Sequence, residues 1–174
     1  MANVSQRIQS VIDGLHYDFN QFSLDGFIQH LEVSRKRAIV QVAYEFNPGL
    51  TGLWIPAQTA DYIFYTRSTH PIHQVHIVLH EVAHMVLEHP CKRIDQILPA
   101  SLVQALHLSD AVLTRIAGKP ISEVEEVEAE AFVYLVQQHI VSARRLSQLT
   151  NGQSSIEGLN RFTDSLGLLE RPKI

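Results

Sequence analysis

Residues 71–88 read PIHQVHIVLHEVAHMVLE, and this stretch contains the pattern on which the interpretation of the chain depends. Residues 80–84, HEVAH, have the form HExxH, which is typical of a zinc site with its own general base. Pro71 suits the first turn of a helix, and no further helix breaker follows before Pro90. A helix that is apolar on most sides is buried. The apolar residues of this helix are Ile72, Val75, Val78, Leu79, Val82, Met85 and Val86.

Helical spacing gives the HExxH pattern a chemical meaning. Side chains four residues apart face the same side of a helix, so His80 and His84 can reach one metal ion together. Glu81 projects beside the first histidine, where it can act as a general base towards a water molecule. His73 and His76 extend the row of imidazoles. Hydrogen-bonded helix histidines are commoner than ligands, and a role for this pair in steadying an oxyanion stays open.

The third ligand is expected among the glutamates of residues 121–136, ISEVEEVEAEAFVYLV. A catalytic zinc site needs three protein ligands and an open position for water. On a helix, Glu126 and Glu130 share one border of the buried face, whereas Glu128 lies along the other border. We expect one of Glu126 and Glu130 to bind the metal and the other to orient a ligating imidazole. Glu128 is expected to contribute little.

The whole chain is interpreted as a single helix-rich α+β domain, residues 1–174, with one small sheet. Alternating apolar residues and turn signals predict a small antiparallel sheet within residues 38–66. Its three strands are expected at 40–46, 52–56 and 61–66. The expected helices are 5–15, 23–37, 71–88, 93–106, 108–117 and 121–140, followed by a C-terminal helical segment at 141–174.

Composition excludes several classes of protein. The chain has 174 residues, 45% of them hydrophobic, which suits one globular domain. Its net charge is −4 and its longest basic run is the triplet at 35–37, which argues against a nucleic-acid surface. No stretch approaches the run of about 18 apolar residues expected of a membrane span, and the start lacks the apolar core of a signal peptide. With a single cysteine, Cys91, there is no internal disulfide. We expect a cytoplasmic protein.

Two stretches together resemble a known family. HEVAHMVLEH followed by EVEAEAFVYLV is similar to the ImmA/IrrE family of bacterial metallopeptidases, which pair HExxH with a later E-x-E-A-x-x-F-A-like helix. The upstream sequence GLWIPAQTADYIFYT also resembles the small sheet of that family, so the likeness spans residues 38–140. The resemblance implies a gluzincin-like metallopeptidase core, in which the sheet packs against the HExxH helix. It also implies Zn²⁺ as cofactor, with ligands His80, His84 and Glu126, general base Glu81, and Glu130 as the second choice for the third ligand.

The expected activity is hydrolysis of peptide bonds in a regulatory protein. The resemblance implies a helix-turn-helix repressor as partner, with no direct contact to nucleic acid or membrane. The alternative is a non-catalytic regulator or toxin component that binds a repressor or antitoxin. The tetrahedral oxyanion needs a stabiliser besides the metal, for which the candidates are His73, His76, Tyr65 and Tyr134. An extended substrate is expected to add to an exposed sheet edge at residues 61–66.

Overall fold

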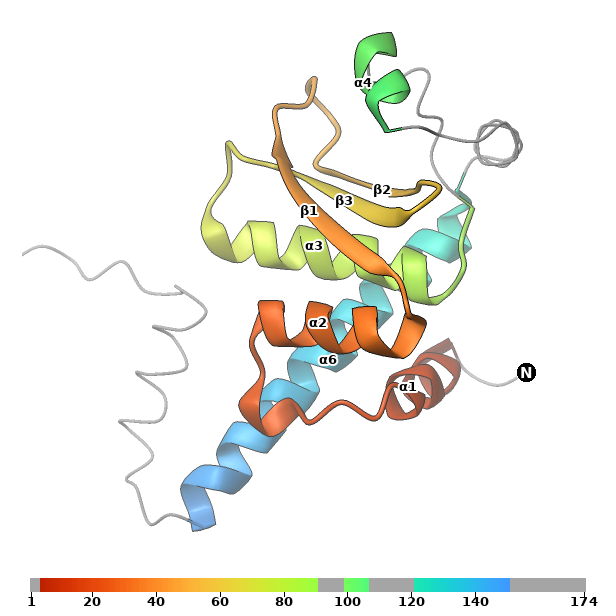
Figure 1. Ribbon diagram of the computed structural model, residues 1–174. Helices are drawn as coiled ribbons and strands as arrows, with labels where there is room; N and C mark the ends of the chain where they lie inside the picture. Colours follow the sequence, from red (N-terminus) through yellow and green to blue (C-terminus); the bar gives the residue numbers. More distant parts are fainter. Residues whose placement is uncertain (1–3, 91–98, 107–120, 151–174) are drawn as a thin grey trace, which may run out of the picture.

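The computed structural model describes residues 4–90, 99–106 and 121–150 (Figure 1). Within these ranges the protein is helix-rich, with one small three-stranded sheet. The elements are α1 (Val4–Gly14), η1 (Phe19–Gln21), α2 (Leu24–Arg35), β1 (Ala38–Tyr44), β2 (Gly52–Pro56), β3 (Ala60–Thr66), α3 (Pro71–Val86), α4 (Ala100–Ala105) and α6 (Glu123–Thr150). The helix expected at 108–117, the first part of that at 93–106, Cys91 and residues 151–174 lie outside the described residues.

The sheet is mixed, so the expectation of a wholly antiparallel sheet is wrong. Strand order is β1-β3-β2, in which β2 is antiparallel to β3 but β1 is parallel to it. Alternation of apolar and polar residues predicts strands without fixing the direction of pairing. Because β1 and β2 flank β3, they lie about 10 Å apart, twice the usual spacing between strands. Residues 45–51 are long enough to carry the chain across that distance.

Strand β3 is the central strand, and this overturns the expectation that residues 61–66 offer an exposed edge to a substrate. Ile63 and Phe64 point to opposite faces of the sheet, and both are buried. A strand buried on both faces is best placed between two neighbours, where its backbone groups pair on both sides. In the described part of the sheet, the outer strands are β1 and β2.

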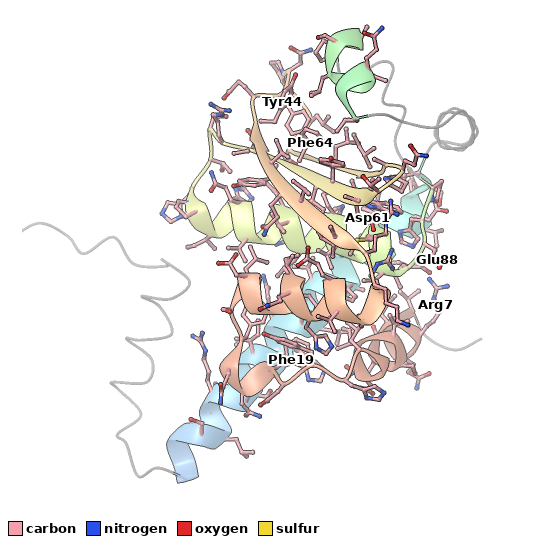
Figure 2. The ribbon with its side chains drawn as sticks, in the orientation of Figure 1. Arg7, Phe19, Tyr44, Asp61, Phe64 and Glu88 are labelled. Carbon is pink, nitrogen blue, oxygen red and sulfur yellow. The ribbon has the colours of Figure 1, made fainter. Side chains whose placement is uncertain are left out.

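Helix α3 contacts β2 and β3 on one side and α6 on another (Figure 1). Leu79, Val82 and Met85 have almost no exposed surface, as expected for a helix that is apolar on most sides. On the opposite face of the sheet from α3, the rings of Tyr44 and Phe64 pack edge to face, 5.9 Å apart (Figure 2).

Helix α6 connects the N-terminal helices to α3. Its buried residues include Phe132 and Val136, and α1 packs against it through the buried Ile8 and Ile12. The helix continues to Thr150, so position 141, where a separate C-terminal segment was expected to begin, lies inside α6. Among the described residues, no helix combines the length and apolar character needed to cross a membrane.

Candidate metal centre

Helices α3 and α6 bring three metal-binding side chains together. His80 Nε2 lies 3.0 Å from His84 Nε2 and 3.0 Å from Glu126 Oε2, and His84 Nε2 lies 3.7 Å from the same oxygen. Zinc bonds of this type are about 2.0–2.1 Å long, so tetrahedral ligand atoms lie about 3.3 Å apart. Two imidazole nitrogens and a carboxylate oxygen are also ordinary zinc donors. The three residues therefore fit one zinc ion in both spacing and chemistry.

The candidate site is buried on one side and accessible on the other. His84 is only 1% exposed, whereas the side chains of His80 and Glu126 are 14% and 41% exposed. A catalytic metal must keep a position open for water or substrate. The partly exposed side chains of His80 and Glu126 leave the candidate site in contact with solvent.

Glu130 contacts the other nitrogen of the same imidazole. Its Oε1 lies 2.9 Å from His80 Nδ1, and its Oε2 lies 3.5 Å from His76 Nε2. The two glutamates of one helix border thus meet opposite nitrogens of His80. A carboxylate on Nδ1 fixes the ring and leaves Nε2 for a metal. His76, His80 and Glu130 form a second group that could hold an ion, but this group lacks His84 and would use the Nδ1 atom of His80.

The general-base candidate is held by the neighbouring strand. Glu81 is 3% exposed, and its Oε2 accepts a hydrogen bond of 2.8 Å from the backbone N–H of Trp54 in β2. A Cβ at Gly52 would lie 2.6 Å from Glu81 Oε1 and 2.6 Å from Ile77 Cγ2. Strand β2 can therefore approach α3 this closely only because residue 52 is glycine.

The three remaining candidates have different surroundings. His73 is exposed, and its Nδ1 lies 3.3 Å from the hydroxyl oxygen of Thr69. Tyr65 is half-buried and lies opposite Gly52 in the sheet, so it shares the sheet face that meets Glu81. Tyr134 is 60% exposed, and its hydroxyl accepts a hydrogen bond from Gln138.

Glu130 links His76 to the candidate metal centre, since it contacts both His76 and His80. The His73 ring lies 6.2 Å from the His76 ring. Tyr65 shares a sheet face with the backbone that approaches Glu81. Among the described contacts, the hydrogen bond of Tyr134 stays within its own helix and does not join the cluster.

His89 and Arg7, which the sequence did not single out, complete the surroundings of His84 together with Glu128. His84 Nδ1 lies 2.9 Å from His89 Nδ1, and His89 Nε2 lies 3.1 Å from Glu128 Oε2. Arg7 of α1 forms an ion pair with the same carboxylate. Glu128, which was expected to contribute little, is linked to His84 through His89. Its border of α6 faces the end of α3, where Glu88 adopts a left-handed φ of 56° and the chain turns His89 back towards His84.

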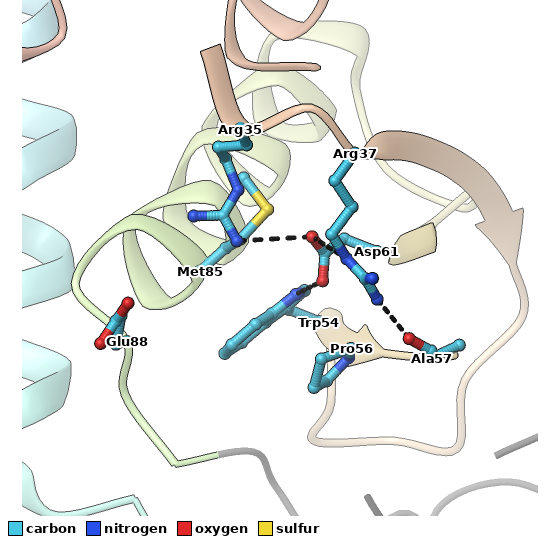
Figure 3. A pocket seen from close by; sticks show the side chains of 8 residues that line it. All are labelled: Arg35, Arg37, Trp54, Pro56, Ala57, Asp61, Met85 and Glu88. Carbon is cyan, nitrogen blue, oxygen red and sulfur yellow. Dashed lines mark hydrogen bonds and ion pairs between the residues drawn. The ribbon is translucent and has the colours of Figure 1, made fainter. Parts of the chain in front are cut away.

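A separate cavity of about 330 Å³ lies beside the indole of Trp54 (Figure 3). The buried Asp61 carboxylate accepts hydrogen bonds there from Trp54 Nε1 at 3.1 Å and from Arg37 Nε at 2.9 Å. Arg37 also donates to the carbonyl oxygens of Ala57 and Ala60. These groups bind one another and fix the β2–β3 turn, so their role is to hold Trp54, whose backbone N–H meets Glu81.

Comparison of the chain with protein-family models, with curated proteins and with solved structures gives no match.

Proposed function

We propose that the protein is a zinc-dependent endopeptidase with a gluzincin-like catalytic core. One observation carries the proposal: the donor atoms of His80, His84 and Glu126, contributed by two different helices, lie within 4.8 Å of one another. Such a set, followed directly by a glutamate within the HExxH pattern, suits hydrolysis of an amide bond. His80, His84 and Glu126 would hold the ion, and Glu130 would orient His80.

When bound, zinc supplies an acidified water molecule and polarises a peptide carbonyl. The chain supplies the proton transfers. Glu81 takes a proton from the attacking water and then gives it to the nitrogen of the leaving amine. The hydrogen bond from Trp54 N–H restrains the Glu81 carboxylate during both transfers. His76, held by Glu130, and Tyr65 are the better-placed candidates to stabilise the oxyanion.

The proposed substrate is a regulatory partner protein, and its proposed class is a helix-turn-helix repressor. This part of the proposal is supported by the resemblance of HEVAHMVLEH and EVEAEAFVYLV to the ImmA/IrrE family. The net charge of −4 and the short basic triplet support a protein partner rather than a nucleic acid.

A second candidate function is that of a regulator or toxin component that binds its partner without cleaving it. The observation that favours this alternative is the state of Glu81, which is 3% exposed and hydrogen-bonded to a backbone amide. A general base must reach the water molecule that it deprotonates. The two candidates differ in one experiment, because only the peptidase depends on the carboxylate of Glu81.

The first test is metal binding. Protein stripped with chelator and titrated with zinc is expected to take up close to one ion per chain, because the two possible donor groups share His80. Absence of zinc binding after reconstitution would overturn the metallopeptidase proposal.

The second test is cleavage. The zinc-loaded parent and the Glu81→Gln variant are incubated with a proteome-derived peptide library, and new termini are identified by mass spectrometry. We expect cleavage by the parent and none by Glu81→Gln, with equal zinc content, because an amide cannot accept the proton. Glu45→Gln, the same change at an exposed position directly after β1, is the matched control and should cleave as the parent does. Zinc binding without cleavage by the parent would favour the non-catalytic regulator.

A further inference from the structure

Three residues from separate parts of the chain form a series of contacts that begins at His84 Nδ1, the ring nitrogen that does not face Glu126. His89 follows the end of α3, Glu128 belongs to α6, and Arg7 belongs to α1. The contacts run in sequence from His84 Nδ1 to His89 Nδ1 at 2.9 Å, from His89 Nε2 to Glu128 Oε2 at 3.1 Å, and from Glu128 to Arg7. We call these three residues, Arg7, His89 and Glu128, the relay.

The direction of each hydrogen bond in the relay follows from its carboxylate end. An ionised carboxylate can only accept, so His89 Nε2 must carry the proton in the bond to Glu128. A neutral imidazole with its proton on Nε2 has a lone pair on Nδ1. His84 Nδ1 must then be the donor in the bond to His89. In a neutral His84 ring, the lone pair is left on Nε2, the atom that faces His80 and Glu126.

We propose that the relay residues are positioning residues that hold the proton of His84 on Nδ1 and thereby present its Nε2 lone pair to a metal ion. The step to metal binding rests on the proposed function, whereas the proton position does not. The contacts of His80 do not decide between its two nitrogens in this way, because Nδ1 faces Glu130 at 2.9 Å and Nε2 faces Glu126 at 3.0 Å.

Burial makes this assignment consequential. His84, His89 and Glu128 are 1%, 5% and 9% exposed, so water offers little alternative hydrogen bonding. If the His84 proton moved to Nε2, His89 would have to donate from Nδ1, and its Nε2 lone pair would face the Glu128 carboxylate. An unmade hydrogen bond between buried groups is unfavourable, and more so when one of them is charged. Arg7 is more exposed, and its contribution is to balance the charge of Glu128.

The proton position is measured directly in the metal-free parent protein. Long-range ¹H–¹⁵N correlation spectra distinguish imidazoles with a proton on Nδ1 from those with a proton on Nε2 alone. The signals of His84 are assigned by their loss in His84→Gln. We expect His84 to carry its proton on Nδ1. We expect His89 to carry its proton on Nε2 and to have an unprotonated Nδ1. A His84 ring with an unprotonated Nδ1 would overturn the proposal without any variant having to fold.

Two substitutions at residue 89 separate positioning from packing. His89→Phe fills the space but removes the acceptor that His89 offers to His84 Nδ1, and zinc affinity should fall by about 10–100-fold, the usual effect of losing such a partner. His89→Asn can place an amide oxygen near the former Nδ1 position, and it should retain the His84 Nδ1 proton and most of the zinc affinity. If His89→Asn loses as much affinity as His89→Phe, or if His89→Phe loses none, the relay does not position His84.

The matched control is His139→Phe. His139 also joins α6 to α1, through a contact of 2.7 Å with Gln9, but this contact does not lead to His84. Its variant should keep the parent's zinc affinity and His84 proton position. Circular dichroism of each variant establishes that the helices are intact.

The two proposals fail in different ways. If the parent binds no zinc but His84 carries its proton on Nδ1 only while His89 is present, the relay stands and the proposed function fails. If the parent binds zinc and His89→Phe changes neither the His84 proton position nor the affinity, the proposed function stands and the relay fails.

Discussion

Gly52→Ala should disturb Glu81, the proposed general base, without touching a proposed metal ligand. The added Cβ would lie 2.6 Å from Glu81 Oε1, 2.6 Å from Ile77 Cγ2 and 3.0 Å from Glu81 Cγ. Ordinary contacts begin at 3.4 Å, so the closest atoms must separate by 3.4 − 2.6 = 0.8 Å. Glu81 and Ile77 are both buried, which leaves them little room to move. We expect β2 and the Glu81 carboxylate to be pushed apart and their hydrogen bond at Trp54 N–H to weaken.

Overpacking of this kind lowers the free energy of unfolding by about 1–3 kcal/mol. A loss of about 2 kcal/mol corresponds to a fall in Tm of about 4–8 °C for a chain of this size. Misplacing a catalytic group by about 1 Å lowers activity by about 100-fold, so kcat/KM for a cleaved peptide should fall by that order. Zinc affinity should stay at the parental value, because Glu81 is not among the proposed ligands.

The assays are thermal melting, zinc titration, peptide cleavage and amide hydrogen exchange at Trp54. Exchange at Trp54 should accelerate in Gly52→Ala, because its N–H loses a buried acceptor. The matched control is Gly14→Ala, where the new Cβ meets no atom within 4 Å. Parental melting and parental exchange at Trp54 in Gly52→Ala would refute the close contact between β2 and α3.

Three further substitutions test other parts of the structure. Glu126→Ala should abolish tight zinc binding, whereas Glu130→Ala should weaken it by about 10–100-fold; the reverse order in a competitive titration would make Glu130 the ligand. Asp61→Ala removes a buried acceptor of Arg37 and should lower the free energy of unfolding by about 3 kcal/mol, measured in urea; parental stability would contradict this role. Phe132→Ala leaves a cavity at a fully buried position and should lower the free energy of unfolding by about 3–5 kcal/mol. A smaller loss would show that the core closes over the cavity.

The sequence predicted those parts of the site that depend on helical spacing. His80 and His84 lie four residues apart on one helix, and Glu126 and Glu130 lie four apart on another. Fixed helix geometry turns such spacing into a shared face, and the buried face of α6 determines which glutamates can reach α3. The structure accordingly brings both glutamates to His80.

Contacts made by the backbone were not predictable in this way. The indole of Trp54 is buried, yet the contact with Glu81 comes from its backbone N–H. Gly52 matters because it lacks a side chain. The position of β1 beside β3 likewise depends on how residues 45–51 cross the sheet, and alternation within a strand carries no information about that path.

Residues separated by helix ends were missed for a related reason. His89 lies beyond the end of α3, so helical phase no longer applies to it, and its approach to His84 depends on the left-handed turn at Glu88. A histidine directly before Pro90 was the available sequence signal. Glu128 was placed on the correct border of α6, but nothing in the helix itself indicated that the end of α3 faces this border.

The parallel pairing of β1 with β3 also bears on the order in which the chain folds. Pro56 pairs with Asp61, 61 − 56 = 5 residues away, whereas Ala38 pairs with Ala60, 60 − 38 = 22 residues away. Closing the longer loop costs more chain entropy, so we expect the hairpin of β2 and β3 to form first and β1 to join it afterwards. During synthesis on the ribosome, β1 emerges before β3, the strand with which it pairs. Helices α3 and α6 come together later still, since His80 and Glu126 are 46 positions apart, so the candidate metal centre is incomplete until α6 has been made.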